Sequence, residues 1–223
     1  MMKTHTLAMA CALMLDAGAT HAQTAGTRML RGGLTSITPQ VDSGNLSASS
    51  LPGTQIDADS DSRLGGGLTY MLTNHWAVDL PLALPFQHNL TGAGAIQGVG
   101  KIGQTKALPM SVFGQYRFGE AQAQFRPFVG AGLTYAKFYK ERGNATLTAI
   151  TGGTSSNPTT LSLDSKLALS IQAGATVALN DRWFVEGTVV KTFLKTKGTL
   201  STGQTIDVTL DPLTLCLGIG YRF

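Results

Sequence analysis

The dominant feature of this sequence is an alternation of apolar and polar residues with a period of two. It is clearest over residues 164–179, where the odd positions from Leu167 to Leu179 are apolar and the even positions between them are small or polar. A helix would distribute these residues around its axis, so the stretch predicts a β-strand with one apolar face. The predicted strand is far longer than the roughly five or six residues that are usual in globular sheets.

The same alternation returns along the chain and predicts about eight strands. It is clear in residues 75–87, 107–118, 124–138 and 211–223, less regular in 63–72 and 182–196, and weakest in 27–38. Short connections are expected at Thr73-Asn74, Gly119–Gln124 and Asn180-Asp181. Longer polar connections are expected at 39–61, 91–105 and 141–163, with a shorter one at 199–204.

Long strands joined alternately by short turns and long loops are the layout of an outer-membrane barrel. No segment after residue 22 has the roughly 18 consecutive apolar residues of a transmembrane helix, and a closed barrel is the other structure that satisfies every backbone hydrogen bond inside a bilayer. We therefore predict an all-β fold, an eight-stranded antiparallel transmembrane β-barrel with short periplasmic turns and long extracellular loops.

The first 22 residues have the pattern of a secretory signal peptide. Lys3 supplies a positive charge, Leu7–Leu15 is an apolar run, and small residues follow, with Ala19 or Ala22 as the last residue before cleavage. The expected organisation is a signal peptide at 1–22 and a barrel at 23–223, located in the outer membrane of a Gram-negative bacterium after cleavage. The mature chain would keep one cysteine, Cys216, which excludes an internal disulfide.

Charge and motifs argue against several other functions. The formal charge is +4, but the basic residues are scattered and the chain is exported, so no nucleic-acid partner is expected. GVGKIG at 98–103 lacks the strand and helix that a nucleotide site needs, and His75 and His88 stand at opposite ends of one predicted strand. We expect no cofactor, no metal site and no catalytic residue, and therefore not an enzyme. A lipid-modifying barrel enzyme is the alternative that a lipid-hydrolysis assay would test.

Aromatic residues flank the predicted short turns, on the apolar face of each strand. Such rings are expected where strands cross from lipid to headgroups. The predicted aromatic girdle consists of Tyr70, Trp76, Tyr116, Phe118, Phe125, Trp183, Tyr221 and Phe223. A smaller set at the other interface would consist of Phe86, Tyr135 and Phe193.

Three stretches resemble the OmpW family of small outer-membrane proteins. They are residues 64–90, 118–139 (with FRPFVGAGLTY) and 210–223 (closing on LDP…GYRF). The resemblance covers essentially the whole mature chain. It implies an eight-stranded barrel with a narrow, mainly hydrophobic lumen, and an association with passage of small hydrophobic molecules across the outer membrane.

The face opposite the lipid predicts how the lumen is lined. Near the short turns it carries charges that would cost roughly 2–4 kcal/mol for each Arg or Lys at mid-bilayer depth on the lipid side: Arg31, Asp79, Arg117, Arg126, Glu186 and Arg222. These residues would form either a structural ion-pair network or a gate. Above them the predicted apolar path is lined by Pro81, Ala83, Pro85, Pro109, Phe113, Phe128, Val190 and Cys216.

These features favour a passive path for small hydrophobic molecules through a narrow apolar lumen. Pro81, Pro85 and Pro109 lack a ladder N–H, so weakened strand pairing near them would allow release sideways into the membrane. The alternative is a structural barrel whose long loops contact phage, bacteriocins or host factors. Expected partners are outer-membrane lipids, small hydrophobic solutes and the outer-membrane assembly machinery, which would read the C-terminal strand ending at Phe223. A monomer is expected.

Overall fold

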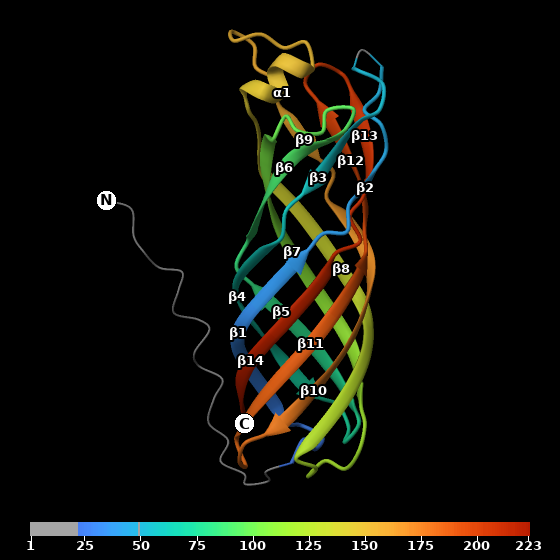
Figure 1. Cartoon of the computed structure of the whole chain (residues 1–223). Helices are drawn as coiled ribbons and strands as arrows, with labels where there is room; N and C mark the ends of the chain where they lie inside the picture. Colours follow the sequence, from blue (N-terminus) through green and yellow to red (C-terminus); the bar gives the residue numbers. More distant parts are fainter. Residues whose placement is uncertain (1–21, 49) are drawn as a thin grey trace, which may run out of the picture.

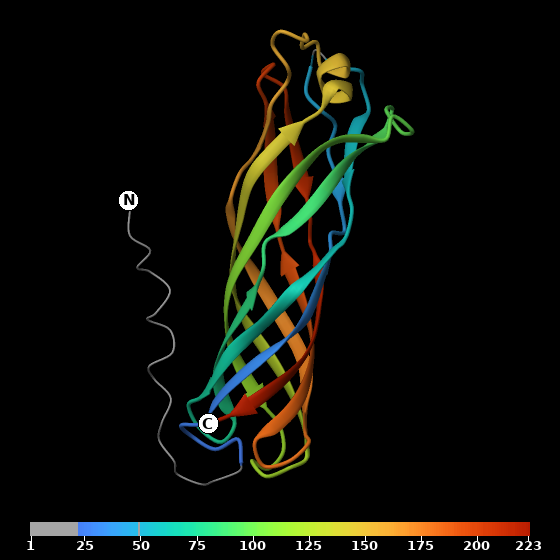
Figure 2. The same cartoon turned by 90° about the vertical axis from the view of Figure 1, so that its left-hand side faces the viewer.

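A computed structural model describes residues 22–48 and 50–223 of the chain. Apart from Ala22, the predicted signal peptide lies outside these residues. The described part forms one tall, tilted-strand barrel, with short turns at one end and a taller rim of strands and loops at the other (Figures 1 and 2). No helix among the described residues is long and apolar enough to cross a membrane.

Eight antiparallel wall strands make up the barrel, and the third is interrupted into two segments, β5 and β6. The wall strands are β1 (Arg28–Thr38), β4 (Asp61–Met71), β5 (Trp76–Ala83) with β6 (Phe86–Gly94), β7 (Lys101–Arg117), β8 (Phe125–Gly143), β10 (Lys166–Ala178), β11 (Trp183–Phe193) and β14 (Leu213–Arg222). Each pairs with its neighbours, and β7 with β8 completes the ring. The predicted eight-stranded barrel is confirmed.

The first and last wall strands form the seam of the barrel. Their ladder runs from Met29 opposite Arg222 to Thr38 opposite Leu213. Beyond it, the Phe223 N–H donates to the Arg28 carbonyl at 2.9 Å and the Arg28 N–H donates to the Phe223 carbonyl at 3.3 Å. The last residue of the chain is therefore fixed by two backbone hydrogen bonds at the turn end.

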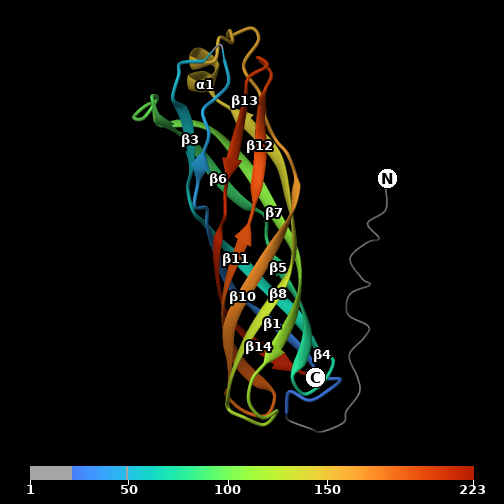
Figure 3. The ribbon, with the colours of Figure 1, turned by 90° about the vertical axis from the view of Figure 1, so that its right-hand side faces the viewer.

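The rim opposite the turns has more regular structure than the sequence predicted. A second sheet of four strands lies there in the order β2 (Asp42–Ser43), β13 (Thr205–Thr209), β12 (Lys195–Leu200) and β9 (Leu161–Leu163). The strand β3 (Thr54–Ala58) pairs with β6, and the helix α1 (Ala145–Ile150) sits at the top (Figure 3). The helix begins at Asn144, whose side chain accepts the Leu147 N–H.

The prediction of a loop at 91–105 is wrong. The loops predicted at 39–61 and 141–163 are shorter than expected, because parts of both ranges form strands or a helix. The strands β6 and β7 continue through most of 91–105 and leave only residues 95–100 as a turn. Outside the bilayer the outer face of a strand meets water, so its residues no longer need to be apolar and the alternation becomes hard to see. The inner face keeps the pattern, with buried Leu90 and Ile102.

The placement of Phe86 on the lipid side is also wrong, because the wall is irregular between β5 and β7. One ladder ends at Asp79 opposite Phe113, and the next begins at Phe86 opposite Ala107. Six residues (80–85) therefore face five (108–112) without ladder pairing, and the extra residue reverses which side chains point inward. Phe86 is fully buried inside the barrel. We call this stretch the wall break.

A band of apolar side chains covers the outer surface of the wall. Its members include Leu34, Leu64, Leu82, Leu167, Leu169, Leu215 and Leu217, each more than half exposed in the isolated chain. The opposite face of the same strands is buried, as the alternation predicts. An apolar exterior around a closed wall is the surface that a bilayer requires.

Candidate functional site: the barrel lumen

The aromatic residues of the predicted girdle lie on the outer surface beside the turns. Trp76, Tyr116 and Phe118 form one edge-to-face group, with ring centroids 5.0–5.1 Å apart. Trp183, Tyr221 and Phe223 form a second one at 4.9–5.1 Å. Tyr70 on β4 and Phe125 on β8 are exposed as well. Tyr135 and Phe193 are exposed nearer the other end.

Inside the turn end, charged side chains fill the lumen. Arg31 on β1 donates to Asp79 on β5 twice, from Nη1 to Oδ1 at 2.7 Å and from Nη2 to Oδ2 at 3.0 Å. Thr69 on β4 donates to the same carboxylate at 2.6 Å. Gly67 leaves the room for this guanidinium, since a Cβ there would lie 2.7 Å from Arg31 Nη2.

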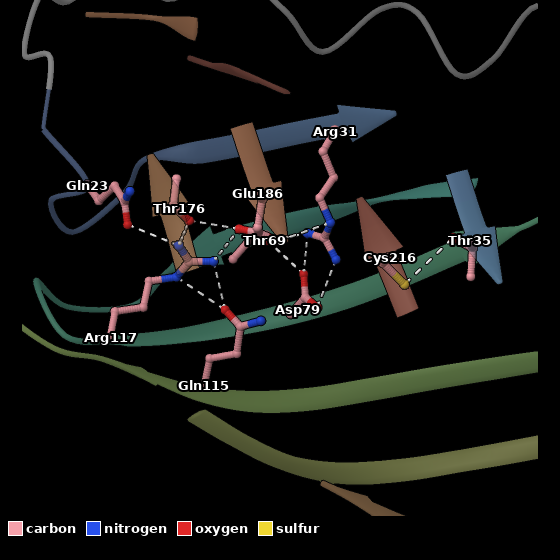
Figure 4. A network of polar contacts seen from close by, with 10 residues as sticks. All are labelled: Gln23, Arg31, Thr35, Thr69, Asp79, Gln115, Arg117, Thr176, Glu186 and Cys216. Atoms are coloured by element: carbon pink, nitrogen blue, oxygen red, sulfur yellow. Dashed lines mark hydrogen bonds and ion pairs between the residues drawn. The ribbon is translucent and has the colours of Figure 1, made fainter. Parts of the chain in front are cut away.

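Glu186 on β11 joins this pair to a second arginine (Figure 4). Its Oε1 lies 3.2 Å from Arg31 Nε, and its Oε2 lies 3.1 Å from Arg117 Nη2. Thr176 donates to Oε2 at 2.9 Å, and Gln115 accepts from Arg117 Nη2 at 2.9 Å. Six wall strands (β1, β4, β5, β7, β10 and β11) are thereby connected across the lumen by ion pairs and charge-assisted hydrogen bonds, which are stronger than neutral ones.

The N-terminal segment completes this network, which the sequence did not indicate. The Gln23 side-chain oxygen accepts from Arg117 Nη1 at 3.0 Å, and the Gln23 backbone carbonyl accepts from Arg126 Nη1 at 3.0 Å. Arg126 also donates to the backbone carbonyls of Phe118 and Asn74 in the turns. Gln23 is almost fully buried. A lone polar residue before the first strand gives no periodic signal, so only the fold reveals its role.

Arg222, the last of the six predicted charges, is buried as well. Its guanidinium carbon lies 5.4 Å from the ring centroid of Phe184 on β11. Phe184 belongs to a buried cluster with Met29, Met71 and Ala77. All six predicted charges thus lie inside the turn end. We call this assembly, with Gln23, Thr69, Gln115 and Thr176, the periplasmic plug.

Two phenylalanine rings lie directly above the periplasmic plug. Phe128 packs against Arg117, whose guanidinium carbon is 4.6 Å from the ring centroid. Phe113 packs over Gly132, where a Cβ would come within 2.8 Å of its ring. Both rings are about 1% exposed. The barrel is therefore closed by side chains at this level.

A chain of hydroxyl groups follows higher up. Ser111, Thr134, Ser170 and Thr192 are linked in that order at 2.8, 2.7 and 2.9 Å across four wall strands. These hydroxyls satisfy one another, so they present little unmet polarity to the space above them.

That space is an apolar cavity of about 80 Å³ in the upper half of the barrel. Its apolar lining consists of Ile37, Pro39, Val41, Ile56, Ala58, Leu90, Ala107, Pro109, Ala136, Phe138, Leu163, Leu194, Val208, Leu210 and Pro212. His88 and several threonines complete the wall, together with Asp57. A smaller apolar pocket lies next to it under α1 and shares Ile56 and Leu90 with it.

The cavity lies higher than the predicted apolar path. Of the eight residues of that path, Pro109 lines the cavity. Phe113 and Phe128 belong to the closed level, and buried Val190 lies on β11 opposite Gln172. Pro81, Ala83 and Pro85 are half-buried at the wall break, and Cys216 accepts from Thr35 at 3.6 Å. Five of the apolar cavity residues were missed because they belong to stretches expected to be loops, namely Pro39, Val41, Ile56, Ala58 and Leu163. Others, such as Ala136 and Phe138, lie at the upper ends of predicted strands.

The titratable side chains of the described residues do not form a cluster that could bind a metal ion. Among these residues no group of three or more His, Cys, Asp and Glu side chains could hold an ion. His75 Nδ1 lies 3.1 Å from the Arg117 carbonyl, and His88 Nδ1 lies 2.7 Å from the Asp59 carbonyl. His75, just before β5, and His88, near the start of β6, are thus in separate, backbone-directed contacts.

Comparisons with known proteins agree with this architecture. The model of the OmpW family matches residues 24–223. Outer membrane protein W of Vibrio cholerae is 33% identical over the full length of both chains. The dibenzothiophene metabolism operon protein PahQ of Pseudomonas aeruginosa is 26% identical over 80% of this chain and 79% of its own. The crystal structure of the outer membrane protein OprG from Pseudomonas aeruginosa superposes with a TM-score of 0.80, 28% identity, and coverage of 92% and 99%. The chain belongs to the OmpW family, whose members are non-enzymatic β-barrels of the Gram-negative outer membrane.

Proposed function

We propose that this barrel takes small hydrophobic molecules from outside the cell into its apolar cavity and releases them sideways into the membrane through the wall break. The observation that carries the proposal is the position of the cavity. It lies above a filled lumen and reaches the wall at Ala107 and Pro109, next to the stretch where β5 and β7 lose their ladder.

The chemistry of the cavity supports an apolar ligand. Its lining is dominated by Ile, Leu, Val, Pro, Ala and Phe side chains. Removing apolar surface from water contributes about 25 cal/mol per Å², whereas a hydrated ion would lose its water without gaining partners. Selectivity for hydrophobic molecules follows from this difference.

The two ends of the lumen support a sideways exit. Towards the periplasm a solute would meet Phe113 and Phe128 and then the periplasmic plug, whose ion pairs are buried and costly to separate. Towards the wall break it would meet the stretch where residues 80–85, which include Pro81 and Pro85, have no ladder pairing with β7. Separating strands there breaks fewer bonds.

The name of one relative is consistent with such a substrate. A relative is described as a dibenzothiophene metabolism operon protein, and dibenzothiophene is an apolar, fused aromatic compound. We infer a similar class of solute for this chain, namely small uncharged molecules with little hydrogen-bonding capacity.

Uptake of a fluorescent apolar solute by cells with and without the protein tests the proposal. The blocking variant is Ala136→Trp, since Ala136 is buried in the cavity wall. The matched control is Leu169→Trp, which adds the same ring to the lipid-facing side of the adjacent strand. We expect uptake to fall to the level of cells without the barrel in the first variant only. Equal uptake with and without the wild-type protein would refute transport.

A further inference from the structure

Several lysines of the upper wall form no ion pair with a carboxylate of the described residues. Among them are Lys106 on β7, Lys137 on β8 and Lys195, which opens β12 above β11. By contrast, Lys166 lies 3.2 Å from Asp164. The charges of Lys106, Lys137 and Lys195 are therefore available to an external partner.

All three lysines point away from the lumen. Each stands between two residues that line the apolar cavity: Thr105 and Ala107, Ala136 and Phe138, and Leu194 and Thr196. Because successive side chains of a strand point to opposite faces, the lysines between them face the exterior.

The same lysines lie just beyond the apolar band. Lys137 and Lys195 follow Tyr135 and Phe193, which are 40% and 47% exposed, by two residues on the same face. Two residues of a strand span ~7 Å. At the corresponding positions of β1 and β4, two residues beyond exposed leucines, the chain has Ser36 and Ser62, which bond each other at 3.0 Å. Lys106, Lys137 and Lys195 therefore lie on the side of the barrel away from the Ser36–Ser62 pair.

The spacing suits a ligand with more than one negative group. Lys106 is opposite Tyr139 and Lys137 is opposite Leu108, so the two lysines are diagonal neighbours, ~7–8 Å apart at their backbones. Lys195 lies two strands further round the wall and, by register, level with Tyr135, so its backbone is ~12 Å from that of Lys137 at ~4.8 Å per strand and ~3.4 Å per residue. We call these three residues the lysine collar.

We propose that the lysine collar binds the phosphate groups of an anionic glycolipid in the outer leaflet of the membrane. Its position at the edge of the apolar band places the ammonium groups at headgroup depth, with their aliphatic stems along the outer wall. A compact ammonium is a suited partner for phosphate, and an anionic membrane surface attracts basic residues at its edge. Continuity with the lipid-facing surface favours a lipid over a soluble anion. This inference is independent of solute uptake.

Native mass spectrometry of the folded full-length protein in neutral detergent tests the proposal. The probes are purified bis-phosphorylated lipid A, the same lipid without its phosphates, and inorganic phosphate. The site variant is Lys106→Gln with Lys137→Gln, and the control is Lys101→Gln with Lys166→Gln, which removes the same charge from lysines that contact Gln104 and Asp164. A third variant, Lys106→Arg with Lys137→Arg, keeps the charge.

We expect bis-phosphorylated lipid A to bind the wild-type protein more tightly than the dephosphorylated lipid. At ~1 kcal/mol for each lysine near an anionic surface, the site variant should bind it about thirtyfold more weakly. The control and the arginine variant should stay near wild type. Equal binding of both lipids, equal losses in site and control variants, or displacement of the lipid by millimolar inorganic phosphate would overturn the proposal.

Discussion

Arg31 and Asp79 form a two-pronged ion pair across the lumen, with Nη1 2.7 Å from Oδ1 and Nη2 3.0 Å from Oδ2. Both side chains are buried, and β4 lies between their strands. The pair thus connects two strands across the interior of the barrel. Its two side chains help to fill the lumen at the turn end.

The variant Asp79→Asn tests how much this pair contributes to the stability of the barrel. The change keeps the shape of the side chain but leaves the Arg31 guanidinium with less charge compensation, so stability should fall by about 3–5 kcal/mol. Urea unfolding in phospholipid vesicles, followed by tryptophan fluorescence, measures the loss. Arg63→Gln, which breaks the more exposed pair with Asp61, should cost below about 1 kcal/mol. Similar losses in the two variants would contradict this assignment.

Gln23 is expected to stabilise the periplasmic plug although it precedes the first strand. In Gln23→Ala, Arg117 and Arg126 lose the side-chain acceptor that they share. Leaving a buried donor unsatisfied costs about 1–3 kcal/mol, which the same unfolding measurement detects. Gln122→Ala, in an exposed position of the neighbouring turn, is the control and should be neutral. A neutral Gln23 variant would show that water replaces the side chain without loss.

The lipid-facing band can be tested with a charge. Leu217 on β14 is 66% exposed and points outward. An arginine there would be placed in hydrocarbon, at a cost of about 2–4 kcal/mol if the position is near the bilayer centre. Thr199→Arg, on the outer face of β12 above the band, should have little effect. The measurement is the efficiency with which each variant folds into lipid vesicles. Equal efficiency of the two variants would contradict the assignment of Leu217 to the lipid-facing band.

Deleting Phe223 tests the role of the chain end. The deletion removes both backbone hydrogen bonds with Arg28 and the ring that packs on Tyr221. We expect less barrel in the outer membrane and more protein in the periplasm, measured by cell fractionation. Phe223→Tyr, which keeps the ring and the backbone, should insert normally. Normal insertion of the shortened chain would argue against recognition of this end.

The sequence predicts the part of the molecule that lies in the bilayer better than the part above it. In the bilayer each strand faces lipid on one side and the packed lumen on the other, so apolar and polar residues alternate strictly. This alternation was enough to predict the wall strands and the inward position of Arg31 and Glu186. Above the bilayer water replaces lipid, and the residues 91–105 lost that signal although they are strands. A single extra residue between Asp79 and Phe86 reversed the facing of β6, because parity arguments hold only within an uninterrupted ladder.

The site was harder to predict than the fold. The six charges were identified because a charge on the lipid side is costly. The cavity was placed too low, since its lining residues, such as Leu90 and Phe138, lie on strands that extend beyond the membrane. Gln23 was missed because no pattern surrounds it.

The most direct test of the account is uptake of an apolar fluorescent solute by cells carrying Pro81→Ala with Pro85→Ala. The new N–H groups would allow the ladder between β5 and β7 to close, and Pro127→Ala on β8, away from the wall break, is the matched control. We predict that uptake falls towards the level of cells without the barrel in the double variant and is unchanged in the control. Wild-type uptake in the double variant would contradict release through the wall break.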